Sequence, residues 1–336
     1  MDLSTRYCGL QLACPLIPGA GPFGEDLDQL RRLEDAGAAA VVLPSLFEEQ
    51  IPSRWRRIKD QLSTAPTEQA IAACRLGPDE YLDHVAKARQ ALGIPVFASL
   101  NGASSEGWID YARLIEQAGA SALELNIYFL AAEPEETGEQ VEWRTIEIAR
   151  SVRAGVTIPL AVKLSPYYSS VSALATAIDG VGVDALVLFN RFYQPDIDLD
   201  SNLVAPQISL STPAELPLRL RWLALLHGRI EASLAVTGGV HSAQDALKAI
   251  LMGASAVQLV SSILKAGPQH LTHIQTELAR LLEQRQVDRL QSAVGQLSLL
   301  QTRDPAAYER ANYIRVLREF SATRPPAPAP DPSTPL

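Results

Sequence analysis

The sequence predicts a single-domain α/β protein with the architecture of a (β/α)8 TIM barrel, and three observations carry this prediction. Short runs of Val, Leu, Ile and Ala recur along the chain, and they are continuous instead of alternating with polar residues. Such runs are typical of parallel strands buried on both faces. Segments with the helical spacing of apolar residues separate these runs. Glycine follows several of the segments where a helix would end.

Eight apolar runs are the predicted strands. They span residues 14–20, 39–45, 95–101, 121–126, 159–165, 184–190, 232–238 and 255–261. A doubly wound open sheet also alternates strands and helices and is the competing architecture. Eight strand–helix units therefore favour a closed barrel, and a chain of 336 residues is long enough to bury its core in one domain.

The segments between the strands have the spacing of amphipathic helices. Their apolar residues are Leu27, Leu30, Leu33 and Ala36 in the first segment, and Tyr111, Leu114, Ile115 and Ala118 in the third. Gly37, Gly119 and Gly253 each stand between such a segment and the next strand. Glycine there can adopt the left-handed conformation that ends a helix. This repeated device supports the βα repeat.

The two ends of the chain add further elements. Residues 3–15 predict a small hairpin that closes the bottom of the barrel, with Cys8 and Gly9 near its turn. Residues 269–283, 287–299 and 305–320 are predicted to be helices that pack over the outside of the barrel. The predicted domain spans residues 1–323, and the proline-rich residues 324–336 are predicted to be a disordered tail.

Composition excludes several classes of protein. A formal net charge of -9 and a pI near 5.2 argue against a nucleic-acid partner, which would require clustered Lys and Arg. No apolar stretch approaches the roughly 18 residues of a membrane span, and the N-terminus lacks the pattern of a signal peptide. The three cysteines form no C-x-x-C pair, so neither disulfides nor a metal or iron–sulfur site is expected. These features predict a cytoplasmic protein.

The loops after the seventh and eighth strands predict a phosphate site, because barrels of this type commonly hold phosphate there. Gly238 and Gly239 follow the seventh strand and allow backbone N–H groups to approach a ligand closely. Ser261 and Ser262 follow the eighth strand and offer hydroxyl and N–H groups. Ordinary turns are the alternative interpretation of either loop alone.

Polar side chains also mark other strand ends. Lys163 lies in an apolar fifth strand, where an ammonium group without a partner would be costly, so we interpret it as functional. Asn101, Asn126 and Asn190 end the third, fourth and sixth strands and suggest recognition of a planar, amide-rich ring. Glu124 needs a buried partner, and an ion pair inside the barrel and a catalytic role are both open.

Taken together, several short motifs resemble the dihydroorotate dehydrogenase family. They are LIPGAGPFGEDL at residues 16–27, ELN at 124–126, VKL at 162–164, TGG at 237–239 and VSS at 260–262. The resemblance runs from about residue 3 to residue 277. It implies an FMN-dependent oxidoreductase of CH–CH bonds that oxidises dihydroorotate, a small molecule, to orotate in pyrimidine biosynthesis.

By motif position, the resemblance also implies roles for individual residues. The cofactor-binding residues would be Ala20, Gly21, Asn101, Lys163, Gly238, Gly239, Ser261 and Ser262, and the substrate-binding residues would be Asn126 and Asn190. Lys163 would face the N1/O2 edge of the flavin. A homodimer and a soluble electron acceptor are further expectations.

Three features depart from the family pattern. Phe129 stands where the family has a Cys or Ser base, and a phenyl ring cannot accept a proton. The family's flavin-contacting Lys after strand two is absent from residues 41–45, and its asparagine-rich loop is absent from residues 47–76. Tyr128 is the nearest substitute for the base, and a phenol with a pKa of ~10 donates a proton more readily than it accepts one.

These departures leave alternatives open. Tyr128 and Phe129 could instead pack over the flavin, and Cys74 could replace the missing base. The chain could be a divergent flavin reductase of another unsaturated substrate, or a phosphate-binding TIM barrel without redox activity. The colour of the purified protein separates the flavoprotein hypotheses from the last one.

Overall fold

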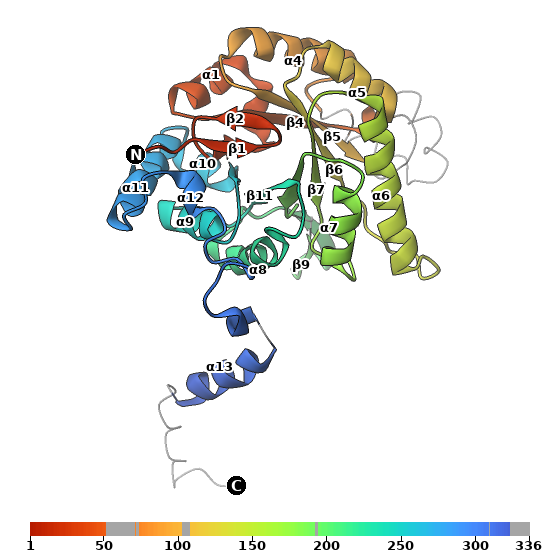
Figure 1. Cartoon of the computed structure of the whole chain (residues 1–336). Helices are drawn as coiled ribbons and strands as arrows, with labels where there is room; N and C mark the ends of the chain where they lie inside the picture. Colours follow the sequence, from red (N-terminus) through yellow and green to blue (C-terminus); the bar gives the residue numbers. More distant parts are fainter. Residues whose placement is uncertain (52–70, 72–73, 103–107, 192–193, 309, 323–336) are drawn as a thin grey trace.

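The computed structural model describes residues 1–51, 71, 74–102, 108–191, 194–308 and 310–322. Eight parallel strands form one sheet in the order β3-β12-β11-β8-β7-β6-β5-β4, and helices surround it (Figure 1). The amide of Ala39, just before β4, donates to the carbonyl of Leu16 in β3 at 3.0 Å and joins the two ends of the sheet. The predicted (β/α)8 TIM barrel is confirmed.

Every predicted strand overlaps an observed one. The barrel strands are β3 (Leu16–Pro18), β4 (Val41–Phe47), β5 (Val96–Gly102), β6 (Ala122–Ile127), β7 (Leu160–Leu164), β8 (Ala185–Leu188), β11 (Ser233–Thr237) and β12 (Ala256–Leu259). All residues of β5, β6, β7, β8 and β12 are buried. Burial on both faces explains why these strands are continuous apolar runs in the sequence.

The outer layer consists of helices that each bury one face. They are α1 (Leu27–Asp35), α4 (Pro78–Ala91), α5 (Trp108–Gln117), α6 (Gly138–Gly155), α7 (Val171–Asp179), α8 (Leu216–Leu226), α9 (Ala243–Leu251), α10 (Ser261–Ala266) and α11 (His270–Gln284). Short 3-10 helices are η1 (Pro22–Glu25), η2 (Glu48–Gln50) and η4 (Pro213–Glu215). Helix α1 shows the pattern, since Asp26 caps its N-terminus and Leu30 and Leu33 are buried.

The predicted glycine terminators are confirmed. Gly37, Gly119 and Gly253 have φ values of 96°, 90° and 118°, in the left-handed region that favours glycine. The predicted apolar face of α5 is wrong at one position, because Leu114 is 39% exposed. Ala112 occupies the buried position instead, so the buried face of α5 is rotated from the one predicted.

The predicted N-terminal hairpin is also confirmed. Strands β1 (Thr5–Tyr7) and β2 (Leu10–Leu12) pair in antiparallel fashion, and Cys8 and Gly9 form the turn with positive φ values. The Cys8 amide donates to Ser233 Oγ at 2.8 Å, at the beginning of β11. This contact places the hairpin at the end of the barrel where the strands begin.

A second hairpin was not predicted. Strands β9 (Gln194–Asp198) and β10 (Leu203–Gln207) pair in antiparallel fashion between β8 and η4. The residues that follow β10 return the chain to the barrel mouth, where Ile208 and Leu210 line a cavity. This segment contains proline and aspartate residues, which are rare in strands, so the sequence does not indicate a hairpin here.

The C-terminal predictions have mixed outcomes. Helix α11 confirms the predicted helix at residues 269–283. At residues 287–299 only a short helix, α12 (Leu290–Ala293), forms, so the predicted length is wrong. After η5 (Pro305–Tyr308), helix α13 (Ala311–Ala322) projects away from the barrel (Figure 1) instead of packing on it. Its spacing is amphipathic, but Tyr313 and Ile314 are exposed.

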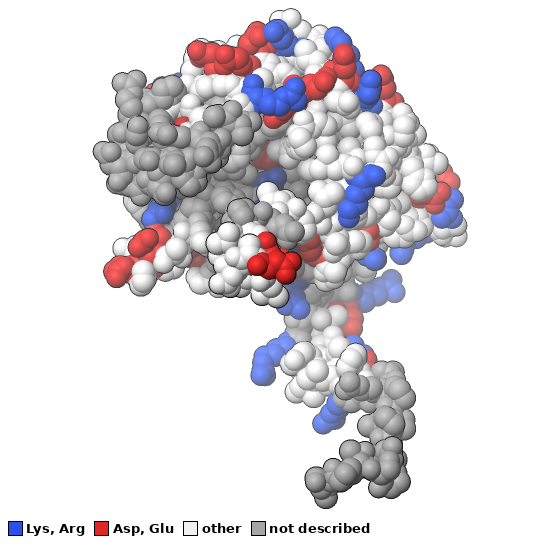
Figure 2. All heavy atoms as spheres, turned by 180° about the vertical axis from the view of Figure 1, so that it is seen from behind, with Lys and Arg blue, Asp and Glu red and all other residues white. Residues whose placement is uncertain are grey.

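Other sequence-based expectations concern the tail, the cysteines and membranes. The predicted disordered tail at residues 324–336 lies outside the described residues. Cys8, Cys14 and Cys74 are free thiols. Within the described part of the chain, no helix has the length and apolar character needed to cross a bilayer. Figure 2 shows acidic and basic side chains interspersed on the described surface of the face it presents.

Candidate active site

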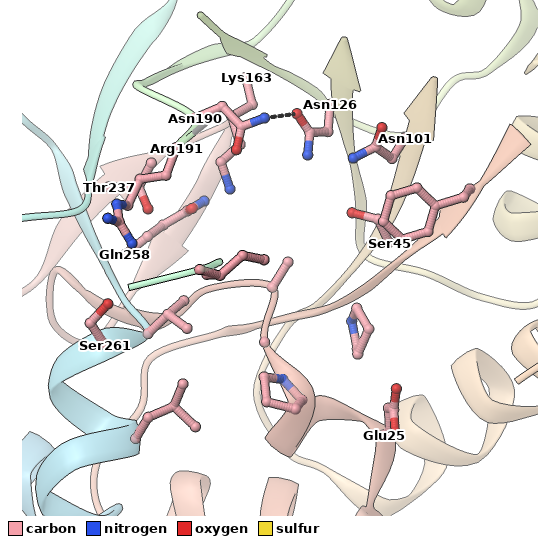
Figure 3. A pocket seen from close by; sticks show the side chains of 18 of the residues that line it. Glu25, Ser45, Asn101, Asn126, Lys163, Asn190, Arg191, Thr237, Gln258 and Ser261 are labelled. Atoms are coloured by element: carbon pink, nitrogen blue, oxygen red, sulfur yellow. Dashed lines mark hydrogen bonds between the residues drawn. The ribbon is translucent and has the colours of Figure 1, made fainter. Parts of the chain in front are cut away.

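A cavity of about 580 Å³ opens at the end of the barrel where the strands terminate (Figure 3). The predicted site residues that line it are Ala20, Gly21, Asn101, Asn126, Lys163, Asn190, Gly238 and Ser261. They come from β5, β6 and β7, from the loops after β3, β8 and β11, and from the beginning of α10, which follows β12. Because parallel strands end at one rim, residues far apart in the sequence meet there.

Strand register places three of these side chains at the same level. Asn101 of β5 is the partner of Asn126 in β6, and Asn126 is the partner of Lys163 in β7. Beyond β8, the amide of Asn190 donates through Nδ2 to Asn126 Oδ1 at 2.9 Å (Figure 3). The cavity therefore presents neighbouring amides and a cation, as the sequence predicted.

Lys163 has a buried carboxylate partner. Its Nζ lies 3.3 Å from Glu124 Oε1, and Glu124 is fully buried. Gln258 of β12 donates through Nε2 to the other carboxylate oxygen. The structure thus shows the interior ion pair that the sequence left open for Glu124. Gln258 was missed because it interrupts an apolar run only once, and its Oε1 is buried without a partner among the described residues.

The loop after β11 packs too tightly for a side chain. Gly238 and Gly239 have φ values of 81° and 83°, and a Cβ on Gly239 would lie 2.7 Å from the Leu216 amide nitrogen. The Gly239 N–H donates to Ser211 Oγ at 3.3 Å. Ser211, which the sequence did not single out, thereby ties this loop to the segment before η4.

The loop after β12 is joined to the same serine. The Ser211 N–H donates to Ser261 Oγ at 2.9 Å. Ser262 is buried, and its hydroxyl has no partner among the described residues. Gly239 and Ser262 lie next to the cavity lining without belonging to it, whereas Gly238 and Ser261 line it. The two predicted phosphate loops therefore meet at one edge of the cavity.

Two arginines bring positive charge to this edge. Arg219 of α8 is buried and donates through Nε to the Thr237 carbonyl at 2.5 Å. Burial is the main cause that lowers the pKa of Arg219. Arg191 lines the cavity, and its Nε donates to Glu215 Oε2 at 3.0 Å. Neither arginine was predicted from the sequence, although the position of Arg191 directly after Asn190 is a usable signal.

With this geometry established, comparison with known proteins decides the family. The model of the dihydroorotate dehydrogenase family matches residues 2–282. The chain belongs to the dihydroorotate dehydrogenase family. This finding confirms the resemblance that the short motifs at the strand ends indicated.

Three known enzyme subunits are similar to the chain over most of its length. The chain is 28% identical over 275 residues to the catalytic subunit of dihydroorotate dehydrogenase B (NAD(+)) from Methanothermobacter thermautotrophicus, covering 80% of this chain and 89% of that protein. It is 26% identical over 304 residues to the same subunit from Geobacillus kaustophilus, covering 87% and 95%. The PreA subunit of NAD-dependent dihydropyrimidine dehydrogenase from Escherichia coli K12 is 23% identical over 327 residues, covering 88% and 76%.

The segment after β6 contains Tyr128 and Phe129, for which the sequence predicts a departure from the family pattern. Tyr128 and Phe129 are half-buried, but neither lines the described part of the cavity. The Phe129 ring lies 4.8 Å from Arg144 Cζ and, with Leu130, lines a separate groove on the outside. The structure therefore does not bring the predicted catalytic Tyr128 together with Lys163.

Cys74, the alternative base, does line the cavity. Partial burial, together with the charges of Glu25 and Glu49, raises the pKa of its thiol above the ordinary value of 9.0. A raised pKa leaves little of this thiol as thiolate at neutral pH, so Cys74 is poorly suited to accept a proton there. The described residues contain no cluster of three His, Cys, Asp or Glu side chains that could hold a metal ion.

Proposed function

We propose that this family member is an FMN-dependent oxidoreductase that oxidises dihydroorotate to orotate, a reaction of pyrimidine biosynthesis. The observation that carries this proposal is the meeting of Lys163, the Asn126–Asn190 amide pair and the two loops after β11 and β12 around one cavity. Relatives named for dihydroorotate and for dihydropyrimidine oxidation support the same class of substrate.

The residues of the cavity edge fit the phosphate of FMN. Backbone N–H groups near Gly238 and Gly239 and the hydroxyls of Ser261 and Ser262 would hold it. The unpartnered hydroxyl of Ser262 is buried, and such groups are rarely left without a ligand, water or protein partner. Arg219 behind the loop adds positive charge, which favours a phosphate dianion over a neutral group.

The floor of the cavity fits a flavin ring. FMN, when bound, supplies the two-electron chemistry, accepting a hydride equivalent from the substrate. Ala20, Gly21 and Asn101 would lie against the ring. Lys163 would face its pyrimidine edge, where a buried ammonium favours the extra negative charge of the reduced state. Glu124 keeps that ammonium in place because it is fully buried and cannot turn to solvent.

The amide pair fits the substrate. Dihydroorotate carries ring N–H and C=O groups, which the side chains of Asn126 and Asn190 would meet with acceptors and donors. Their mutual hydrogen bond fixes which amide atoms remain available. Tyr128, which directly follows β6 but does not line the described part of the cavity, stays the proposed group for the proton that must leave with the hydride.

A reductase acting on another unsaturated substrate is the second candidate, and Phe129 is the observation that favours it. A phenyl ring at the family's base position removes the group that would take a proton from dihydroorotate. Reduction needs a proton donor instead. We further propose a cytoplasmic homodimer that uses a soluble electron acceptor and binds neither nucleic acid nor membranes.

Two measurements, made one after the other, test the proposed function. The chromophore released from purified protein should be FMN, in a ratio of one per chain. Anaerobic mixing with dihydroorotate should then bleach the flavin, whereas dihydrouracil serves as the comparison substrate. A flavoprotein that dihydroorotate does not bleach would support the second candidate, and a colourless protein that does not take up FMN would contradict both.

A further inference from the structure

Arg191 stands apart from the other cations of the cavity. Lys163 is buried and paired inside the barrel, and Arg219 is buried behind the loop after β11. The side chain of Arg191 is 32% exposed and lines the cavity beside Asn190 (Figure 3). It is therefore the arginine of this edge that a ligand can reach.

Among the described residues, the positive charges around Arg191 outnumber the negative ones. Its Nε lies 3.0 Å from Glu215 Oε2, and Nη2 of Arg219 lies 3.8 Å from that same oxygen. Two guanidinium groups thus share one carboxylate. Lys265 adds a third cation at this edge, with Nζ 3.3 Å from the Ser211 carbonyl and no carboxylate partner among the described residues. The excess positive charge favours a bound anion.

Two of the three nitrogens of the Arg191 guanidinium have hydrogen-bond partners among the described residues. Nε donates to Glu215, and Nη1 donates to the Ser209 carbonyl. Nη2 has no hydrogen-bond partner in the described part of the chain. A guanidinium anchored in this way offers its remaining N–H groups in a fixed direction, which suits a carboxylate or phosphate group.

We propose that Arg191 is a ligand-binding residue that holds an oxyanion group in the cavity. The proposal rests on the proposed function for the identity of the ligands. The oxyanion would be the carboxylate of the substrate or the phosphate of the cofactor. The position of Arg191 next to Asn190, a proposed substrate residue, favours the substrate carboxylate. The carboxylate that Arg191 shares with Arg219 favours the cofactor phosphate, because Arg219 contacts Thr237 at the proposed phosphate site.

The substrate arm gives Arg191 a role in specificity. Dihydroorotate carries a carboxylate that dihydrouracil lacks, although the ring amides of the two molecules are the same. An arginine in a region of excess positive charge would stabilise bound dihydroorotate and would not stabilise bound dihydrouracil. Arg191 would then give the enzyme a preference for the acidic substrate dihydroorotate over neutral dihydropyrimidines.

The experiment compares two pairs of ligands in Arg191→Gln and wild-type protein. Calorimetry of the FMN-loaded protein measures the dissociation constants of orotate and of uracil, which differ by the carboxylate. Fluorescence titration of the apo-protein does the same for FMN and riboflavin, which differ by the phosphate. Loss of a charge-assisted hydrogen bond should weaken the anionic member of one pair by about tenfold to a hundredfold and leave its neutral partner unchanged.

A control variant and a stability measurement exclude a general disturbance of the fold. Arg75→Gln removes another arginine of the cavity lining, one that is 73% exposed and paired with Glu25, and should change neither ratio. Glu215 keeps Arg219 as a partner in Arg191→Gln, so the thermal unfolding midpoint should stay close to that of the wild type.

The outcomes are distinct. A selective loss for orotate assigns Arg191 to the substrate carboxylate, and a selective loss for FMN assigns it to the phosphate. If the protein binds FMN but neither ratio changes, Arg191 binds no oxyanion and this inference is overturned while the proposed function stands. If the wild-type protein binds no FMN, the proposed function fails and this inference fails with it.

Discussion

The two sides of the barrel mouth differ in how the residues predicted from the family motifs are arranged. At the ends of β11 and β12, the motif residues Gly238, Gly239, Ser261 and Ser262 meet at one edge and are joined through Ser211. After β6, Phe129 stands where the motif resemblance leads us to expect a base, and its ring lies in an outer groove beneath Arg144. The predicted cofactor residues of one side meet, whereas the predicted reacting group of the other side does not line the cavity.

The difference indicates that phosphate binding and proton transfer place different constraints on the two sides of the mouth. A phosphate needs close backbone approach, and the left-handed φ and tight packing of Gly239 leave no room for another residue. A proton acceptor needs only one suitable side chain, which a single substitution removes. Flavin binding and substrate chemistry can therefore diverge separately, and the following predictions test that separation.

The largest effect is expected from Lys163→Ala. The change leaves the fully buried Glu124 carboxylate without its ammonium partner, so the free energy of unfolding should fall by about 3–5 kcal/mol. FMN retention should weaken, or flavin reduction should slow, in the same variant. Urea unfolding and stopped-flow reduction measure the two effects.

A double variant separates stability from function in that experiment. Glu124→Gln combined with Lys163→Met removes both charges and should recover most of the lost stability. It should not recover flavin reduction, because the cation is still absent. Recovery of both properties, or unchanged FMN content and reduction rate in Lys163→Ala, would refute the role assigned to Lys163.

An intermediate effect is expected from Gly239→Ala. The left-handed φ of 83° costs about 1–2 kcal/mol for a residue with a Cβ. The added Cβ would also lie 2.7 Å from the Leu216 nitrogen, which forces the loop to move and should weaken FMN binding. Thermal unfolding and FMN titration measure these losses.

Gly119→Ala is the matched control for backbone strain. Gly119 has a φ of 90°, but a Cβ there would meet nothing within 4 Å. It should lose stability through strain alone and bind FMN as the wild type does. Equal losses of FMN affinity in the two variants would show that the loop after β11 has no special part in cofactor binding.

The smallest effect is expected from Phe129→Ser, which restores a family base on the divergent side. Because the Phe129 ring points to the outer groove, the new hydroxyl should not reach the cavity, and dihydroorotate should reduce the flavin no faster. Loss of the contact with Arg144 should cost about 0.5–1 kcal/mol. A marked gain in the reduction rate would show that this segment does reach the substrate.

Much of the fold could be predicted because local rules determine it. Buried parallel strands give continuous apolar runs, and Gly37, Gly119 and Gly253 end helices for reasons that need no tertiary information. The projection of α13 could not be predicted, since Tyr313 and Ile314 have amphipathic spacing whether or not a partner surface exists.

The site could be predicted where strand ends supplied its residues. Register alone brings Asn101, Asn126 and Lys163 together. Arg219 reaches the same edge from helix α8, and Ser211 reaches it from an irregular segment, so neither stands at a strand end. Their roles depend on tertiary packing, which the sequence pattern does not encode.

The central claim is that the edge formed after β11 and β12 holds the phosphate of a bound flavin. Titration of the apo-protein with FMN and with riboflavin, followed by flavin fluorescence, tests it most directly. We predict saturation at one FMN per chain and markedly weaker binding of riboflavin. Equal affinity for the two flavins would contradict the phosphate assignment, and a protein that stays colourless in excess FMN would contradict the whole account.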